Sequence, residues 1–163
     1  MTHASACPLC TTDDGQLIWR DAALRVVQVD DADYPGFCRV IWQDHQPEMT
    51  DLDAAAQHHL LDVVLVVEQV LRDVMQCDKI NLASLGNQVP HLHWHVIPRF
   101  TDDAHFPKPV WADAQRTVPE ALHAARVARA GGLAPVLRTA LDAAFFDHPA
   151  DQPAQETDDG RTR

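Results

Sequence analysis

Three histidines at alternate positions, His91, His93 and His95, are the residues of this sequence best suited to chemistry. In a β-strand, side chains at positions i, i+2 and i+4 point to one face, roughly 6.5–7 Å apart. Leu92 and Trp94, which lie between them, would then pack on the opposite face. The alternative is three solvated histidines by chance, which the alternation with large apolar residues disfavours. The pattern therefore predicts a strand that presents three imidazoles together.

Two kinds of chemistry use such an arrangement. Histidines at alternate positions of a strand can bind zinc. A neutral imidazole can also attack an electrophile and form a covalent intermediate, provided that an acceptor holds its second ring nitrogen. Immediately upstream, Gly86 lets the backbone approach a phosphate, and Asn87 and Gln88 add amide donors for its oxygens. The amides beside the imidazoles point to a ligand that carries phosphate.

Cys7 and Cys10 form a C-x-x-C pair near the start of the chain. They are either two free thiols in a reducing cytosol or half of a tetrahedral zinc site, which needs two more ligands. The four cysteines are too few and too scattered for a disulfide scaffold. Redox catalysis by such a pair needs a thioredoxin-like βαβ context, which the sequence lacks.

Five short apolar runs predict the strands that would position these residues. Their β-branched and aromatic residues, and the turn residues between them, are typical of an antiparallel sheet. The runs cover residues 17–19, 24–29, 37–43, 79–86 and 91–100.

A helical period over residues 52–74, with Thr50 as the expected cap, is the strongest secondary-structure pattern in the sequence. Residues 112–146 predict one or two further helices, broken at Gly131 and Gly132. Strands, a long helix, two more strands and a late helical segment together predict an α+β fold with an antiparallel sheet.

The composition bounds the class of protein. A chain of 163 residues with 46% hydrophobic residues is expected to form one globular domain, over residues 1–146. Residues 147–163 are polar and contain proline, which predicts a disordered acidic tail. No apolar run is long enough to span a membrane, and the N-terminus does not resemble a secretory signal, so we expect a cytoplasmic protein. A net charge of −11 without a basic stripe argues against binding to a nucleic-acid duplex, whereas a small anionic ligand is compatible with it.

The segment "HLHWHVI" fits the pattern His-φ-His-φ-His-φ-φ, where φ is an apolar residue, and the chain resembles the histidine triad (HIT) nucleotide hydrolases and transferases. The resemblance runs from about Cys7 to Arg99, includes "PGF", "VIWQDH" and "GNQVPHLHWHVIPR", and is strongest to bacterial diadenosine polyphosphate hydrolase-like members. It implies a five-stranded antiparallel sheet with a long helix and a C-terminal helical segment, usually in a homodimer. No organic cofactor is implied.

The resemblance also implies an activity. A small-molecule nucleotide, either a dinucleoside polyphosphate or a nucleoside phosphoramidate, would be cleaved at its α-phosphate through a nucleotidyl-histidine that water resolves. His93 would be the nucleophile, His95 would contact the α-phosphate or the leaving group, and His91 would help to orient the centre. The implied substrate contacts are Asp30 or the adjacent Asp31 for the ribose, and Asn81, Asn87 and Gln88.

Two departures from the family pattern leave alternatives open. Many HIT proteins have a histidine where this chain has Phe37, and a hydroxyl residue where it has Gln88. A nucleotide-binding or sensing module with little catalysis is therefore the second hypothesis. A zinc hydrolase that uses all three histidines as ligands is the third.

Some HIT branches, and the related galactose-1-phosphate uridylyltransferases, hold zinc with a C-x-x-C pair, a histidine before the long helix and the first triad histidine. The matching positions here are Cys7, Cys10, His45 and His91, so the resemblance implies a structural zinc ion. His91 would then fix the strand beside His93.

Three other residues are also singled out by the sequence. Trp42 and Trp111 are expected in the core or at a dimer contact rather than as stacking partners of a nucleotide. Arg99 either contacts phosphate or pairs with an acidic neighbour.

Overall fold

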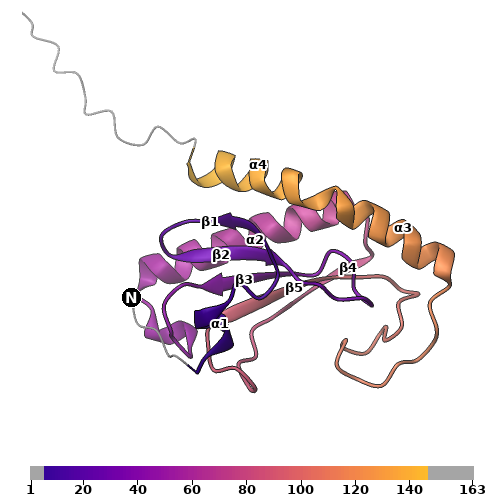
Figure 1. Cartoon of the computed structure of the whole chain (residues 1–163), viewed down its shortest axis with the longest axis horizontal. Helices are drawn as coiled ribbons and strands as arrows, with labels where there is room; N and C mark the ends of the chain where they lie inside the picture. Colours follow the sequence, from indigo (N-terminus) through magenta and orange to yellow (C-terminus); the bar gives the residue numbers. More distant parts are fainter. Residues whose placement is uncertain (1–5, 147–163) are drawn as a thin grey trace, which may run out of the picture.

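The computed structural model describes residues 6–146 and contains a single five-stranded antiparallel sheet in the order β1-β2-β3-β5-β4 (Figure 1). This confirms the predicted α+β fold, while the predicted tail at 147–163 lies outside the described residues. The strands are β1 (Gln16–Arg20), β2 (Leu24–Gln28), β3 (Cys38–Trp42), β4 (Lys79–Ala83) and β5 (His93–Arg99).

The long helix and the late helical segment lie where the sequence predicts them, but one cap differs, and the short helix α1 (Pro8–Thr11) and a 3-10 turn were not predicted. Thr50 lies inside a 3-10 turn, and the side chain of Asp53 caps the long helix by accepting a hydrogen bond from the backbone N–H of Ala56. The helical segment after residue 112 forms two helices that meet at Gly132. The helices are α1 (Pro8–Thr11), α2 (Ala54–Met75), α3 (Glu120–Gly131) and α4 (Leu133–Phe145), with the 3-10 turn at Met49–Asp51.

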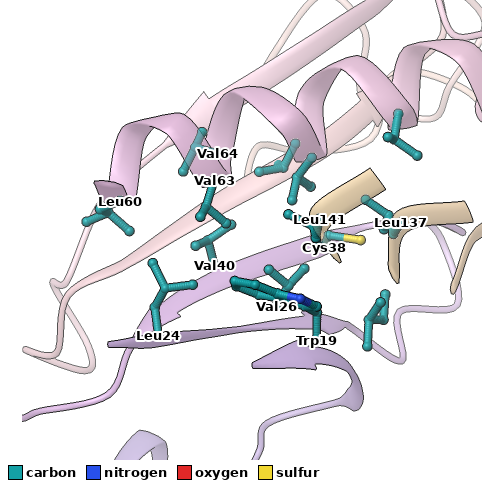
Figure 2. Close-up of a cluster of buried hydrophobic side chains, with 14 of the residues drawn as sticks. Trp19, Leu24, Val26, Cys38, Val40, Leu60, Val63, Val64, Leu137 and Leu141 are labelled. Carbon is teal, nitrogen blue, oxygen red and sulfur yellow. The ribbon is translucent and has the colours of Figure 1, made fainter. Parts of the chain in front are cut away.

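The hydrophobic core lies between one face of the sheet and helices α2 and α4 (Figure 2). Strand alternation explains the division, because Cys38 and Val40 of β3 enter this core while Arg39 and Ile41 lie on the other face. The core side chains of β2, β3, α2 and α4 include Val26, Val40, Leu60, Val63, Val64, Leu137 and Leu141. Burying each large aliphatic side chain contributes about 1.5–3 kcal/mol, so the residues on this face of the sheet stabilise the fold.

The opposite face of the sheet is not covered by α2 or α4. Of the helices in the described residues, the short helix α1 packs there, through Leu9 against Val27 and Ile41. The loop after β5 also packs on this face, where Val110 joins the cluster of Phe37 and Ile97. In Figure 1, α1 lies on the far side of the sheet from the α2–α4 layer. None of the helices in residues 6–146 combines the length and the apolar character that a membrane span requires.

Candidate active site

His93 and His95 lie on β5, between β3 and β4, on the face of the sheet away from α2 and α4. Their rings meet edge to face with centroids 4.8 Å apart. His91 does not continue this row, because β5 begins only at His93. The residues before the strand turn instead, with the backbone N–H of His91 bonded to the carbonyl of Val89. The expected shared face therefore holds for two of the three histidines.

The hydrogen bonds of His93 fix which of its ring nitrogens can react. Its Nδ1 lies 2.5 Å from the backbone carbonyl oxygen of His91, and since a carbonyl only accepts, Nδ1 carries the proton. The Nε2 of the neutral ring is then left with a lone pair. Burial lowers the pKa of His93, although the hydrogen bond to His91 opposes this effect. His93 is therefore a neutral imidazole with an available nitrogen, which is what nucleophilic attack requires.

His95 is held by aromatic rings and not by hydrogen bonds. Its ring packs against Phe37 and Trp111, each with a centroid distance of 5.5 Å. Its Nδ1 is buried without a hydrogen-bond partner among the described residues. Burial, and to a smaller extent the electrostatic effects of the neighbouring His93 and Arg39, together lower the pKa of His95 to about 3. A neutral ring with a buried, unsatisfied nitrogen is suited to a polar ligand that enters the cavity.

His93 and His95 line a cavity of about 530 Å³. Asn87 and Gln88 also line it, and their contact with a phosphate stays a prediction. They follow Gly86, whose φ of 70° is in the left-handed region that glycine adopts without strain. The remaining lining residues come from α1 and its flank, from β3, and from two loops: Pro8, Leu9, Asp14, Arg39, Leu85, Val89 and Trp111.

The structure does not bring Asp30 and Asn81 to this cavity. Asp30 is exposed after β2, and the oxygen Oδ1 of Asn81 accepts a hydrogen bond of 2.6 Å from Arg99. Asp31, the alternative to Asp30, accepts from the backbone N–H groups of Asp33 and Tyr34 and so shapes the turn. Substrate contacts by Asp30 and Asn81 stay predictions from the resemblance.

The four residues predicted to bind metal do come together. Their ligand atoms all lie within 4.8 Å of one another, and they are Cys7, Cys10, His45 and His91. The Nδ1 of His91 is 3.5 Å from both sulfur atoms, and the Nδ1 of His45 is 3.5 Å from that of Cys10. Sulfur and nitrogen ligands around tetrahedral zinc are about 3.3–3.8 Å apart, given bond lengths of about 2.0–2.3 Å. This Cys₂His₂ set therefore fits zinc in both chemistry and spacing.

The tautomer of His91 supports the same conclusion. Its Nε2 lies 2.7 Å from the backbone carbonyl oxygen of Trp42, to which it must donate. The lone pair is then on Nδ1, the nitrogen that faces the thiols of Cys7 and Cys10. Burial lowers the pKa of His91, which favours the neutral form that binds metal. His91 thus faces the other candidate metal ligands with its side chain and His93 with its backbone carbonyl.

Among the cavity residues that the sequence did not predict, three carry a charge or an aromatic ring. Arg39 is a lone cation in the apolar run "FCRVIW", a signal that could have marked it as a residue with a special role. Asp14, next to Gly15, had only the signal of a turn. Trp111 was expected in the core or at a dimer contact, but it is 55% exposed and stands beside His95 because the loop after β5 returns over the sheet.

A buried ion pair anchors the loop that carries Trp111. Arg99 at the end of β5 donates to both carboxylate oxygens of Asp103, at 2.6 and 3.0 Å, and to the carbonyl of Lys108 at 2.8 Å. Asp103 also accepts from the backbone N–H groups of Phe100, His105 and Phe106. Arg99 was expected either to contact phosphate or to pair with an acidic neighbour, and the structure shows that it pairs with Asp103.

Comparison with known proteins agrees with this geometry. A family model for the HIT domain matches residues 11–102. A histidine triad protein from Bradyrhizobium japonicum is 31% identical, with a TM-score of 0.60 over 75% of this chain and 92% of its own. One from Marinobacter aquaeolei VT8 is 26% identical, with a TM-score of 0.60 over 77% of this chain and 92% of its own.

A zinc-bound histidine triad family protein from Mycobacterium smegmatis shares the fold at 20% identity, with a TM-score of 0.58 over 85% of this chain and 97% of its own. No curated protein matches the chain. The family model spans more than half of the sequence and includes the triad. The chain therefore belongs to the HIT domain family, whose members are in general nucleotide hydrolases and transferases.

Proposed function

We propose that the protein cleaves a nucleoside phosphate derivative at its α-phosphate through a nucleotidyl-His93 intermediate. The observation that carries the proposal is the hydrogen bond from Nδ1 of His93 to the carbonyl of His91, which leaves Nε2 unprotonated in a ring that lines the cavity. The volume of about 530 Å³ is in the range of small-molecule sites. Dinucleoside polyphosphates and nucleoside phosphoramidates are the substrate classes that the HIT resemblance favours.

In the first step, Nε2 of His93 forms a bond to the α-phosphorus, and the bond from phosphorus to the leaving group breaks. Negative charge gathers on the phosphoryl oxygens, where the side-chain amides of Asn87 and Gln88 are suited to donate. His95 would contact the same phosphate or the leaving group through its unpaired Nδ1. In the second step, water attacks phosphorus, the P–N bond breaks and the nucleotide leaves.

We also propose that Cys7, Cys10, His45 and His91 hold a structural zinc ion. The relative from Mycobacterium smegmatis is described as zinc-bound, and the donor set here suits that metal. The ion would fix the segment whose carbonyl orients His93. The proposal also includes a homodimer and a cytoplasmic location, as the resemblance to HIT proteins implies.

A nucleotide-binding module with little catalysis is the second candidate. The buried ring of Phe37, 5.5 Å from His95, favours it because this ring offers no hydrogen-bonding group to a reacting phosphate. The zinc hydrolase with three histidine ligands is not supported. Within residues 6–146, the metal-binding cluster takes His91 and leaves out His93 and His95.

The test is to incubate the protein with a diadenosine polyphosphate and with adenosine phosphoramidate, and to follow AMP release and adenylylation by mass spectrometry. His93→Ala should reduce turnover by orders of magnitude and abolish the adduct. His58→Ala is the matched control, because His58 is an exposed histidine of α2 outside the cavity. Full turnover by His93→Ala would refute the mechanism, and tight AMP binding without turnover by the unmodified chain would favour the binding module.

A further inference from the structure

Among the described residues that line the cavity, Arg39 is the only one with a positively charged lysine or arginine side chain. It lies on β3, directly opposite His95 in the ladder between β3 and β5. We propose that Arg39 binds the phosphate group of the nucleotide and that Asp14 holds its guanidinium in place. This inference deepens the proposed function, because it names a group that recognises the substrate in the same cavity.

The guanidinium is only partly satisfied by the protein. Its Nη1 pairs with the carboxylate of Asp14, while its Nε is buried with no hydrogen-bond partner among the described residues. A buried N–H without an acceptor is costly, and it is most costly for a charged group. The Nδ1 of His95 is unpaired in the wall of the same cavity. Because both residues line the cavity, an anion bound there can accept from Arg39 and contact His95.

Phe37 sets the direction of the arginine. The guanidinium carbon of Arg39 is 5.4 Å from the centre of the Phe37 ring, and the same ring packs against His95 at 5.5 Å. Arginine stacked on an aromatic ring keeps its in-plane N–H groups free for a planar or tetrahedral anion. At the place where Phe37 offers no donor, Arg39 thus supplies one.

A tight turn before β1 positions Asp14 as the counter-ion of Arg39. Asp14 has φ of 61°, in the left-handed region, and precedes Gly15 with φ of 147°. A Cβ at Gly15 would lie 2.5 Å from the carbonyl oxygen of Gln28, so the turn needs glycine. The turn places the carboxylate of Asp14 in the wall of the cavity, where it meets Arg39. The ion pair with Asp14 uses Nη1 of the guanidinium, and the N–H groups on the other two nitrogens remain for a ligand.

The charge of Arg39 also matters because the protein as a whole is acidic, with a net charge of −11. A phosphate-bearing ligand would be repelled by such a surface unless the cavity carried a local cation. Arg39 lies opposite His95 in the ladder between β3 and β5, so its positive charge is placed beside the histidines of the cavity. Arginine binds phosphate with charge-assisted hydrogen bonds that are stronger than neutral ones.

The experiment compares AMP with adenosine, which lacks only the phosphate. Calorimetry on the full chain should show that Arg39→Leu weakens AMP binding by roughly 10- to 100-fold, with adenosine changed by less than about threefold. Arg20→Leu is the matched control, since Arg20 also pairs with an aspartate near the N-terminus but does not line this cavity. It should leave both affinities unchanged.

Arg39→Lys keeps the charge, and guards against loss of the fold. It should weaken AMP binding less than Arg39→Leu, because a lysine retains the attraction but lacks the planar fork. Equal losses for AMP and adenosine, or no loss in either variant, would overturn the role of Arg39 without touching the nucleophile. A selective loss of AMP binding in a chain that forms no adduct on His93 would keep Arg39 as a phosphate-binding residue and refute hydrolysis.

Discussion

Replacing Asp103 with asparagine should destabilise the fold and loosen the loop over the active site. The Arg99 and Asp103 side chains are 2% and 3% exposed, so the substitution leaves a buried guanidinium without its counter-charge. Breaking a buried ion pair at one partner costs about 3–5 kcal/mol, a large fraction of the roughly 5–15 kcal/mol that stabilises a typical domain. The hydrogen bonds from three backbone N–H groups would weaken as well.

The neighbouring residue provides the control. Asp102 also pairs with an arginine, Arg126, but its side chain is 51% exposed. Asp102→Asn should therefore cost about 1 kcal/mol or less. Both variants would be compared with the unmodified protein by urea unfolding, followed by circular dichroism. A loss below 1 kcal/mol for Asp103→Asn, or equal losses for both variants, would refute the view that this pair anchors the loop.

The same pair predicts a dependence on pH. Burial alone would raise the pKa of Asp103, but hydrogen bonds from Arg99 and from backbone N–H groups outweigh it and lower the pKa. A carboxyl group whose pKa is lower in the folded state stabilises the fold above its unfolded pKa of roughly 3.9, and this stability is lost as the pH falls. Asp103→Asn should therefore lose less stability than the unmodified protein on acidification below pH 4.

Three further predictions concern the cavity and the metal site. Cys10→Ser should lower the zinc content of the purified protein, measured by atomic absorption, and its melting temperature, whereas Cys77→Ser, outside the cluster, should change neither; equal zinc in both variants would contradict the site. Trp111→Ala should weaken AMP binding by roughly 5- to 150-fold if the exposed indole stacks on the base, and unchanged calorimetric affinity would exclude that stacking. Burial lowers the pKa of His95 to about 3 in the folded protein, whereas a histidine in the unfolded chain has a pKa of about 6.5. Below pH 6.5 the unfolded chain therefore binds a proton that the folded chain does not, and the free energy of unfolding should fall by up to about 1.4 kcal/mol per pH unit toward pH 4. In urea unfolding, His95→Gln should show a shallower slope over that range, and an identical slope would contradict the assignment.

Much of the fold could be predicted from the sequence because its local patterns agree with its tertiary structure. The apolar residues of α2 recur at helical spacing, and those that face the sheet are buried. The row of His93 and His95 with Trp94 between them followed from strand alternation. The four candidate metal ligands were found by resemblance, since Cys7 and His91 are 84 residues apart and no local rule joins them.

What the sequence did not reveal depended on packing between distant segments. His91 does not lie on the same strand face as His93 and His95, because the chain turns before β5 begins. The alternation of residues in the sequence could not show where the strand begins. Arg39 and Asp14 meet only after β1 and β3 have joined the same sheet. Trp111 is apolar, which suggested the core, but the anchor of its loop at Asp103 keeps it at the cavity. The cap of α2 shifted to Asp53 because Thr50 is used in the preceding turn.

His91 belongs to two sites at once, with its ring beside the thiols and its carbonyl bonded to His93. A substitution at this position would therefore disturb both sites, and loss of activity in such a variant would not reveal which of them had failed. Cys10 separates the two, because it meets the ring of His91 but does not line the cavity. Any ligand that tightens the cysteine cluster should, through this one residue, also restrict the motion of the His93 imidazole that lines the cavity.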